Sequence, residues 1–154
     1  MSELKAGDAA PDFTLPTDDG EISLAALRGK PVVLYVYPKD DTSGCTVEAQ
    51  DFTRLQPRFD AAGVVVIGLS KDSARSHGKF RAKYSLTHKL ASDESLETLQ
   101  AYGVWGEKTL YGRKYMGAER ATFLIDREGK IARVWRKVKI DGHADEVLEA
   151  ASDL

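Results

Sequence analysis

The residue best suited to chemistry is Cys45, the single cysteine among the 154 residues of the chain. One thiol cannot form an internal disulfide, and one thiolate alone makes a poor metal site. Cys45 lies in the stretch YPKDDTSGCTVEAQDF, residues 37–52, where a polar loop follows an apolar run. It is therefore either a small buried residue or a reactive sulfur.

The position of Cys45 favours a thiolate. A helix is predicted to begin at about Ser43 or Gly44, which places Cys45 in the first turn. Backbone N–H groups without a partner and the positive end of the helix dipole stabilise a negative charge there. Thr42 is expected to bring its hydroxyl beside the sulfur, and Gly44 to let the backbone approach a small ligand. Pro38 is expected to limit solvent on one side of the loop.

The same residues also have a purely structural interpretation. Free cysteines are often inert small hydrophobes in a core. Thr42 can serve only as a helix cap, Gly44 only as a turn residue and Pro38 only as the end of a strand. The chemistry of these residues alone leaves both interpretations open.

The elements that would position this stretch follow from apolar patterning. Strands are predicted over residues 31–37, 63–69, 89–91, 120–126 and 130–138, with a hairpin within residues 11–24. Helices are predicted from about residue 43 and over residues 73–84, 93–102 and 142–151. Pro57 is expected to kink or end the first helix unless its neighbours compensate, and Gly63 marks the end of that helix. This order predicts one α/β domain over residues 1–154, with a central mixed β-sheet flanked by helices.

The composition excludes several classes of partner. Lys and Arg total 22 against 24 Asp and Glu, and the net charge of -2 predicts no nucleic-acid partner and no anionic membrane surface. No apolar run approaches the roughly 20 residues that cross a bilayer, and the N-terminal segment has no hydrophobic signal core. A single cysteine excludes a disulfide scaffold. A cytoplasmic, reduced setting is predicted.

The three histidines show no metal-ligand spacing, so no metal is expected. His77 and His143 are interpreted as helix-surface or helix-start residues, and His88 as a loop residue. The chain contains no CxxC pair, which argues against a thiol–disulfide oxidoreductase of the thioredoxin kind.

The pattern Pro38-x-x-x-Thr42-x-x-Cys45 resembles the active-site motif of the peroxiredoxins, and YPKDDTSGCTVEAQDF is similar to its form in the peroxiredoxin Q, or bacterioferritin comigratory protein, subfamily. GDAAPDFTLP, YGVWGEKTLYGRKYMGAERATFLIDREGKI and WRKVKIDGHADEVL also resemble that subfamily, so the likeness covers nearly the whole chain. It implies a thioredoxin-like fold. It further implies an antioxidant enzyme that reduces hydrogen peroxide and organic hydroperoxides with no metal, haem or flavin cofactor.

The resemblance also implies residue roles. Cys45 matches the peroxidatic cysteine, which attacks the peroxide and becomes a sulfenic acid. Thr42 matches the threonine that hydrogen-bonds sulfur and peroxide, and Pro38 the proline that shields the sulfenate. Arg120 matches the arginine that stabilises the thiolate; without the resemblance it is interpreted as a surface residue at a strand start. Glu48 either orients an arginine or merely favours the first helical turn.

The chain departs from the subfamily where a resolving cysteine is common. Gln50 and Arg81 occupy two such positions, and Ser43 stands where proline is usual. We therefore predict a one-cysteine cycle in which glutathione, thioredoxin, glutaredoxin or another external thiol resolves the sulfenate. Whether a cysteine was lost naturally or by substitution stays open. Members of the subfamily are often monomeric and the sequence offers no obvious exposed apolar patch, so a monomer is expected.

Three function classes remain distinct at this point. The first is the thiol peroxidase. The second is a redox sensor or chaperone-like protein in which Cys45 oxidises with little turnover. The third is a catalytically silent thioredoxin-like interaction module. The rates of Cys45 oxidation and of turnover separate the three.

Overall fold

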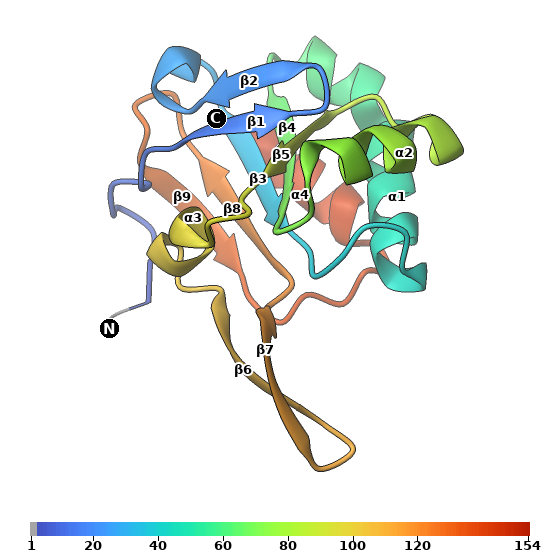
Figure 1. The fold of residues 1–154 in the computed structure, drawn as a ribbon. Coiled ribbons are helices and arrows are strands. Elements are labelled where there is room, and N and C mark those ends of the chain that lie inside the picture. Colours follow the sequence, from blue (N-terminus) through green and yellow to red (C-terminus); the bar gives the residue numbers. More distant parts are fainter. Residues whose placement is uncertain (1–2) are drawn as a thin grey trace.

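The computed structural model describes residues 3–154 and places a mixed sheet at the centre of the fold (Figure 1). The sheet is seven-stranded, in the order β2-β1-β5-β4-β3-β8-β9. Its strands are β1 Thr14–Thr17, β2 Gly20–Ser23, β3 Val32–Val36, β4 Val65–Ser70, β5 Lys89–Ser92, β8 Ala121–Ile125 and β9 Ile131–Trp135. The helices are α1 Ser43–Ala61, α2 Ala74–Tyr84, α3 Glu97–Ala101 and α4 His143–Ser152, with a 3-10 turn, η1, over Ala25–Leu27. The predicted α/β class with an N-terminal hairpin is confirmed.

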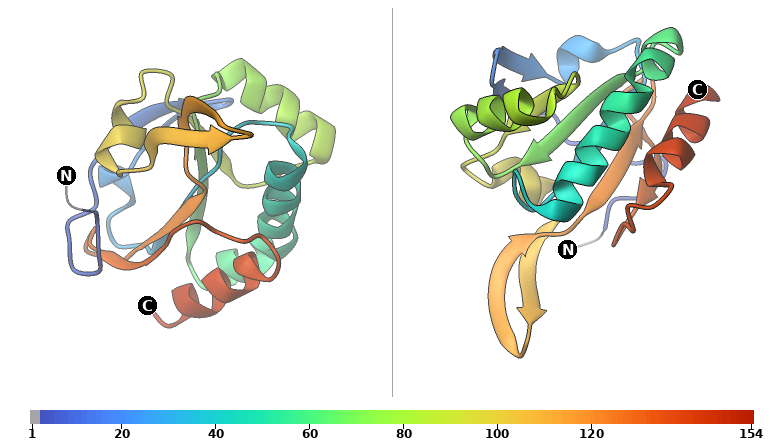
Figure 2. Two further views of the ribbon diagram at one scale, coloured as in Figure 1. Left: turned by 90° about the horizontal axis from the view of Figure 1, so that it is seen from below. Right: turned by 90° about the vertical axis from the view of Figure 1, so that its right-hand side faces the viewer.

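The centre of the sheet is β3, all five of whose residues are buried. It runs parallel to β4 and antiparallel to β8. Val33 and Tyr35 pack in the cluster formed with α1, α2 and α4, whereas Leu34 and Val36 pack in the opposite cluster with α3 and the N-terminal hairpin. Figure 2 shows α1 and α4 side by side on one face of the sheet. Burial of both faces explains why the strand is continuously apolar.

The neighbours of Pro57 compensate for it, and the third helix is shorter than predicted. Pro57 lies inside α1 without ending it, because Phe52, Leu55 and Phe59 are almost fully buried and packing outweighs the lost backbone bond. The third helix was predicted over residues 93–102 but α3 spans only Glu97–Ala101. No helix among residues 3–154 has the length and apolar character to cross a bilayer.

The α3 prediction failed because of a local side-chain bond. The buried carboxylate of Asp93 accepts from the backbone N–H of Leu99 at 2.7 Å. Leu96 has a left-handed φ of 70°, which separates the Asp93 turn from the helix. Asp side chains that bond nearby N–H groups compete with helical pairing in this way.

A second hairpin was not predicted at all. Strands β6, Trp105–Leu110, and β7, Arg113–Ala118, form a separate two-stranded sheet that projects from the body of the molecule (Figure 1). Its tip turns at Tyr111 and Gly112, which both have positive φ, as a two-residue hairpin loop requires. The hairpin exposes apolar side chains, namely Leu110, Tyr111, Tyr115 and Met116. The expectation that no apolar patch would be exposed is therefore wrong here.

Candidate active site

The sheet brings two distant segments of the chain to the same edge of the fold. In the antiparallel pair of β3 and β8, Val36 at the end of β3 lies opposite Ala121 at the start of β8. The loop that leaves β3 leads directly into α1, and Arg120 immediately precedes β8. Arg120 and Cys45 are therefore neighbours in space although they are 75 residues apart in the chain.

Cys45 lies in the first turn of α1, as predicted, with only 1% of its surface exposed. The helix begins after Thr42, whose backbone is extended at φ -96° and ψ 156°. The Cys45 sulfur accepts a hydrogen bond from Nη2 of Arg120 at 3.2 Å. Helix N-termini and guanidinium donors are both features that favour a thiolate over a thiol.

The same guanidinium also holds Glu48. Nη1 of Arg120 donates to Oε1 of Glu48 at 2.6 Å, and the Glu48 side chain is 1% exposed. Glu48 follows Cys45 by three residues, so the two side chains share one face of α1. One positive group thus faces two acidic groups, while Oε2 of Glu48 has no hydrogen-bond partner. Burial raises the pKa of Glu48 from 4.5 to about 7, against the opposing effect of Arg120.

Glu48 therefore does more than favour the first helical turn. Its carboxylate accepts the hydrogen bond of Nη1 of Arg120, and this orients the guanidinium so that Nη2 donates to the Cys45 sulfur. Burial would lower the pKa of Arg120, but its interactions with Glu48 and Cys45 outweigh that effect and raise the pKa above its ordinary value. The guanidinium is a permanent positive charge at this site.

Gly44 allows a close approach beside the sulfur. A Cβ atom at this position would lie 3.1 Å from Cδ1 of Ile140 and 3.4 Å from Nη2 of Arg120. Any side chain at residue 44 would crowd both neighbours. Sequence reasoning did not identify Ile140 as a site residue, because its proximity depends on the path of the chain after β9.

Thr42 and Pro38 both lie in the loop between β3 and α1. The expectation that the Thr42 hydroxyl hydrogen-bonds the sulfur is not met, since it donates instead to the carbonyl oxygen of Lys39 at 2.9 Å. This bond uses the hydroxyl proton and leaves the oxygen lone pairs free to accept. Pro38 is half-buried in the same loop.

The two positions where a resolving cysteine was considered are occupied very differently. Gln50 is exposed on α1. Arg81 lies on α2, where its guanidinium forms an ion pair with Asp18 and donates to the carbonyl oxygens of Leu86 and His88. Neither side chain offers a group that attacks a sulfenic acid.

The histidines are more buried than predicted. His77 is fully buried, so its interpretation as a helix-surface residue is wrong, and His88 is only 2% exposed. His143 begins α4, as expected, but is itself buried. Burial lowers the pKa of His88 to about 3 and that of His143 to about 4. No group of three or more metal-binding side chains is present within residues 3–154.

Comparison with known proteins was made for the whole chain. Residues 6–134 match the model of the AhpC/TSA family. A putative peroxiredoxin bcp of Coxiella burnetii is 53% identical over 146 residues, which cover 94% of this chain and 97% of the relative. The peroxiredoxin Bcp of Bacillus subtilis is 44% identical over 152 residues, covering 98% and 97%.

A solved structure shows the same similarity in three dimensions. The bacterioferritin comigratory protein of Xanthomonas campestris, described for its alkyl peroxide reduction activity, superposes with a TM-score of 0.90 at 42% identity. The match covers 96% of this chain and 98% of that protein. The similarity thus extends over nearly the whole chain.

Proposed function

The chain belongs to the AhpC/TSA family and is a thiol-dependent peroxidase, a peroxiredoxin, and on this premise we propose that Cys45 is the thiolate that attacks the peroxide. Arg120, Thr42 and Pro38 complete the proposed catalytic site, with Glu48 and Gly44 in supporting positions. The observation that carries the proposal is the hydrogen bond of 3.2 Å from Arg120 to the buried Cys45 sulfur. The chain thereby acts as an antioxidant enzyme with a thioredoxin-like fold.

In the first step, the Cys45 thiolate attacks one peroxide oxygen and the O–O bond breaks. The products are a sulfenic acid on Cys45 and an alkoxide or hydroxide, which takes up a proton to leave as an alcohol or water. Arg120 stabilises the thiolate and the negative charge that develops on the leaving oxygen. Thr42, whose own proton is donated to Lys39, accepts the hydrogen bond of the incoming peroxide.

Hydrogen peroxide and organic hydroperoxides are the proposed substrates. Ile140 gives the site an apolar wall beside Gly44, against which an alkyl group can pack. Pro38 shields the sulfenic acid on the loop side. These features support a site that admits a small peroxide and limits water.

An external thiol completes the proposed cycle, because the chain has no second cysteine. The thiol attacks the Cys45 sulfenic acid, releases water and forms a mixed disulfide. A second thiol then releases the Cys45 thiol and a disulfide of the reductant. A Cys45–Cys45 bond between two chains is disfavoured, since the sulfur is 1% exposed. Glutathione, thioredoxin and glutaredoxin are the candidate reductants.

We propose a monomer as the working unit, because the contacts among Cys45, Arg120 and Glu48 all come from one chain. The apolar side chains exposed on the β6–β7 hairpin make the oligomeric state a necessary control, measured by light scattering. A reduced, cytoplasmic setting fits the need for a thiol donor.

The direct test is a peroxide-consumption assay with glutathione and thioredoxin supplied separately. We expect turnover with at least one donor, and Cys45→Ser to abolish it because the chain has no other thiol. Mass spectrometry after one equivalent of peroxide should show a single added oxygen on Cys45. Gln50→Ser, an exposed change on the same helix, is the matched control and should retain turnover.

Two outcomes would support other functions. Fast oxidation of Cys45 without turnover by any donor would favour a redox sensor. Oxidation no faster than that of a free thiol would favour a silent interaction module and would contradict the proposed site.

A further inference from the structure

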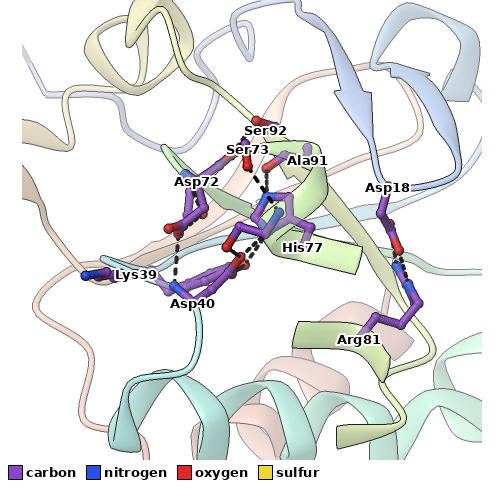
Figure 3. A network of polar contacts seen from close by, with 12 residues as sticks. Asp18, Lys39, Asp40, Asp72, Ser73, His77, Arg81, Ala91 and Ser92 are labelled. Atoms are coloured by element: carbon purple, nitrogen blue, oxygen red, sulfur yellow. Dashed lines mark hydrogen bonds and ion pairs between the residues drawn. The ribbon is translucent and has the colours of Figure 1, made fainter. Parts of the chain in front are cut away.

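A buried polar cluster lies beside the loop that precedes α1, and the proposed reaction does not account for it (Figure 3). Asp40, in this loop, has a side chain only 4% exposed, and His77 of α2 is fully buried against it. The Asp40 carboxylate accepts from the hydroxyls of Tyr37 at 2.6 Å and Ser76 at 2.7 Å. It also contacts Nδ1 of His77 at 2.8 Å.

The partners of His77 determine its charge. Nδ1 faces the Asp40 carboxylate, and Nε2 lies 2.9 Å from the carbonyl oxygen of Ala91. Both oxygens accept hydrogen bonds, since a carbonyl has no proton and this carboxylate already accepts from two hydroxyls. These two acceptors favour a proton on both ring nitrogens, that is, the imidazolium form of His77.

The groups around His77 support that state. Asp40 faces it from the loop and Asp72 from the segment before α2, whereas Tyr37 contributes only a neutral hydroxyl from the end of β3. Burial alone would lower the pKa of His77, but the hydrogen bond and charge of Asp40 outweigh it, and the pKa lies above the ordinary 6.5. Because the pKa values of His88 and His143 are lowered, His77 is the one histidine of the chain expected to be charged near neutral pH.

The cluster also fixes the backbone of the loop. The N–H of Asp40 donates to Oδ2 of Asp72 at 2.9 Å, so Asp40 is held through both its side chain and its main chain. The next residue, Asp41, has a φ of 57°. Its carboxylate accepts hydrogen bonds from Tyr84 and Lys83, both of α2. Helix α2 thus holds the loop at two successive residues directly before Thr42.

We propose that the buried His77–Asp40 ion pair is a positioning device for the peroxide step, which holds the loop so that Thr42 and Pro38 face the reacting oxygen above Cys45. The inference rests on the proposed function but concerns residues that do not touch the sulfur. The pair acts through the loop backbone. The thiolate itself is stabilised separately, by Arg120 and the N-terminus of α1.

A second ion pair on α2 provides a matched control. Asp18 in the turn between β1 and β2 pairs with Arg81, and Figure 3 shows this pair beside the His77 cluster. The Asp18 side chain is 7% exposed, nearly as buried as that of Asp40. The Asp18–Arg81 pair ties the same helix to a different part of the fold, so removing it tests stability without touching the loop.

We expect Asp40→Asn to slow oxidation of Cys45 by peroxide about 10- to 100-fold, because displacing reacting groups by about 1 Å costs up to about 10² in rate. Asp18→Asn should lower the melting temperature but leave the oxidation rate of the folded protein unchanged. Alkylation of Cys45 by iodoacetamide should not slow in either variant, because the thiolate is stabilised elsewhere. Each rate is measured well below the melting temperature.

The charge of His77 is tested independently by ¹⁵N NMR of the wild-type protein. Both ring nitrogens should be protonated at neutral pH, and Asp40→Asn should leave one of them unprotonated. Should Asp40→Asn not fold, Ser76→Ala removes one donor to the same carboxylate and should slow peroxide oxidation to a smaller extent. A neutral His77, a normal oxidation rate in the Asp40 or Ser76 variant, or equal slowing in Asp18→Asn would overturn the proposal.

Discussion

Arg120→Ala is expected to slow the oxidation of Cys45 by peroxide about 10²- to 10³-fold, the range seen when one donor to a developing charge is removed. In the proposed mechanism the guanidinium contributes twice, because it stabilises the thiolate before attack and the leaving oxygen during attack. Arg120→Lys retains the charge but lacks the planar group whose two nitrogens donate to Glu48 and to the sulfur at once. We expect an intermediate rate for it. Rapid-quench oxidation followed by mass spectrometry measures all three proteins.

A loss of rate in Arg120→Ala could also result from a loss of stability, because the substitution leaves Glu48 buried without its partner. Removing one member of a buried ion pair costs about 3–5 kcal/mol of stability. The double variant Arg120→Ala/Glu48→Gln removes that uncompensated charge. It should recover stability while remaining slow. Arg136→Ala, which removes a guanidinium that pairs with Glu119 instead, should keep the wild-type rate. An unchanged rate in Arg120→Ala would make our site assignment wrong.

The parts of the fold that were predicted correctly are those where local pattern and burial agree. Residues 32–36 form a strand buried on both faces, and such a strand must be apolar throughout. The β6–β7 hairpin has no such requirement, because it projects from the sheet and most of its side chains are exposed. Only the turn at Tyr111 and Gly112 signals it, and one glycine is a weak signal.

The residues of the proposed site also differ in how far local sequence predicts them. Cys45 and Gly44 are local to one loop and helix start, so residue chemistry identified them as candidates. The Arg120 contact depends on the pairing of β3 with β8, which spacing along the chain does not reveal; only the family resemblance pointed to it. The charge of His77 depends on acceptors from the loop and from β5, so the sequence pattern of α2 alone made it look like a surface residue.

Glu48 sets a further limit on the reactivity of Cys45, because one guanidinium faces two acidic groups. With both Cys45 and Glu48 ionised, the buried site would carry a net negative charge. With a proton on Glu48, the charges of Arg120 and the Cys45 thiolate balance. The proton held by Glu48, whose pKa is about 7, therefore favours the thiolate near neutrality.

Glu48→Gln is expected to raise the rate of Cys45 oxidation at and above neutral pH, where Glu48 of the wild-type protein loses its proton. Glutamine keeps an oxygen acceptor for Arg120 but cannot carry the competing charge. The ratio of the variant's rate to the wild-type rate should therefore rise as pH increases through about 7, the pKa of Glu48. Glu48→Ala also removes the acceptor that orients Arg120, and should be slower than wild type at every pH. Asp60→Asn, which removes an exposed carboxylate at the far end of α1, should leave the profile nearly unchanged.

The same substitution should change how stability depends on pH. The folded-state pKa of Glu48, about 7, lies above the ordinary 4.5, so between these values the folded protein binds this proton and the unfolded chain does not. The contribution of Glu48 to the free energy of unfolding must then fall as pH rises through this window. Urea unfolding across that range should show the fall in wild type and a flatter curve in Glu48→Gln. If the two proteins share one rate profile and one stability profile, Glu48 is ionised throughout and only orients Arg120.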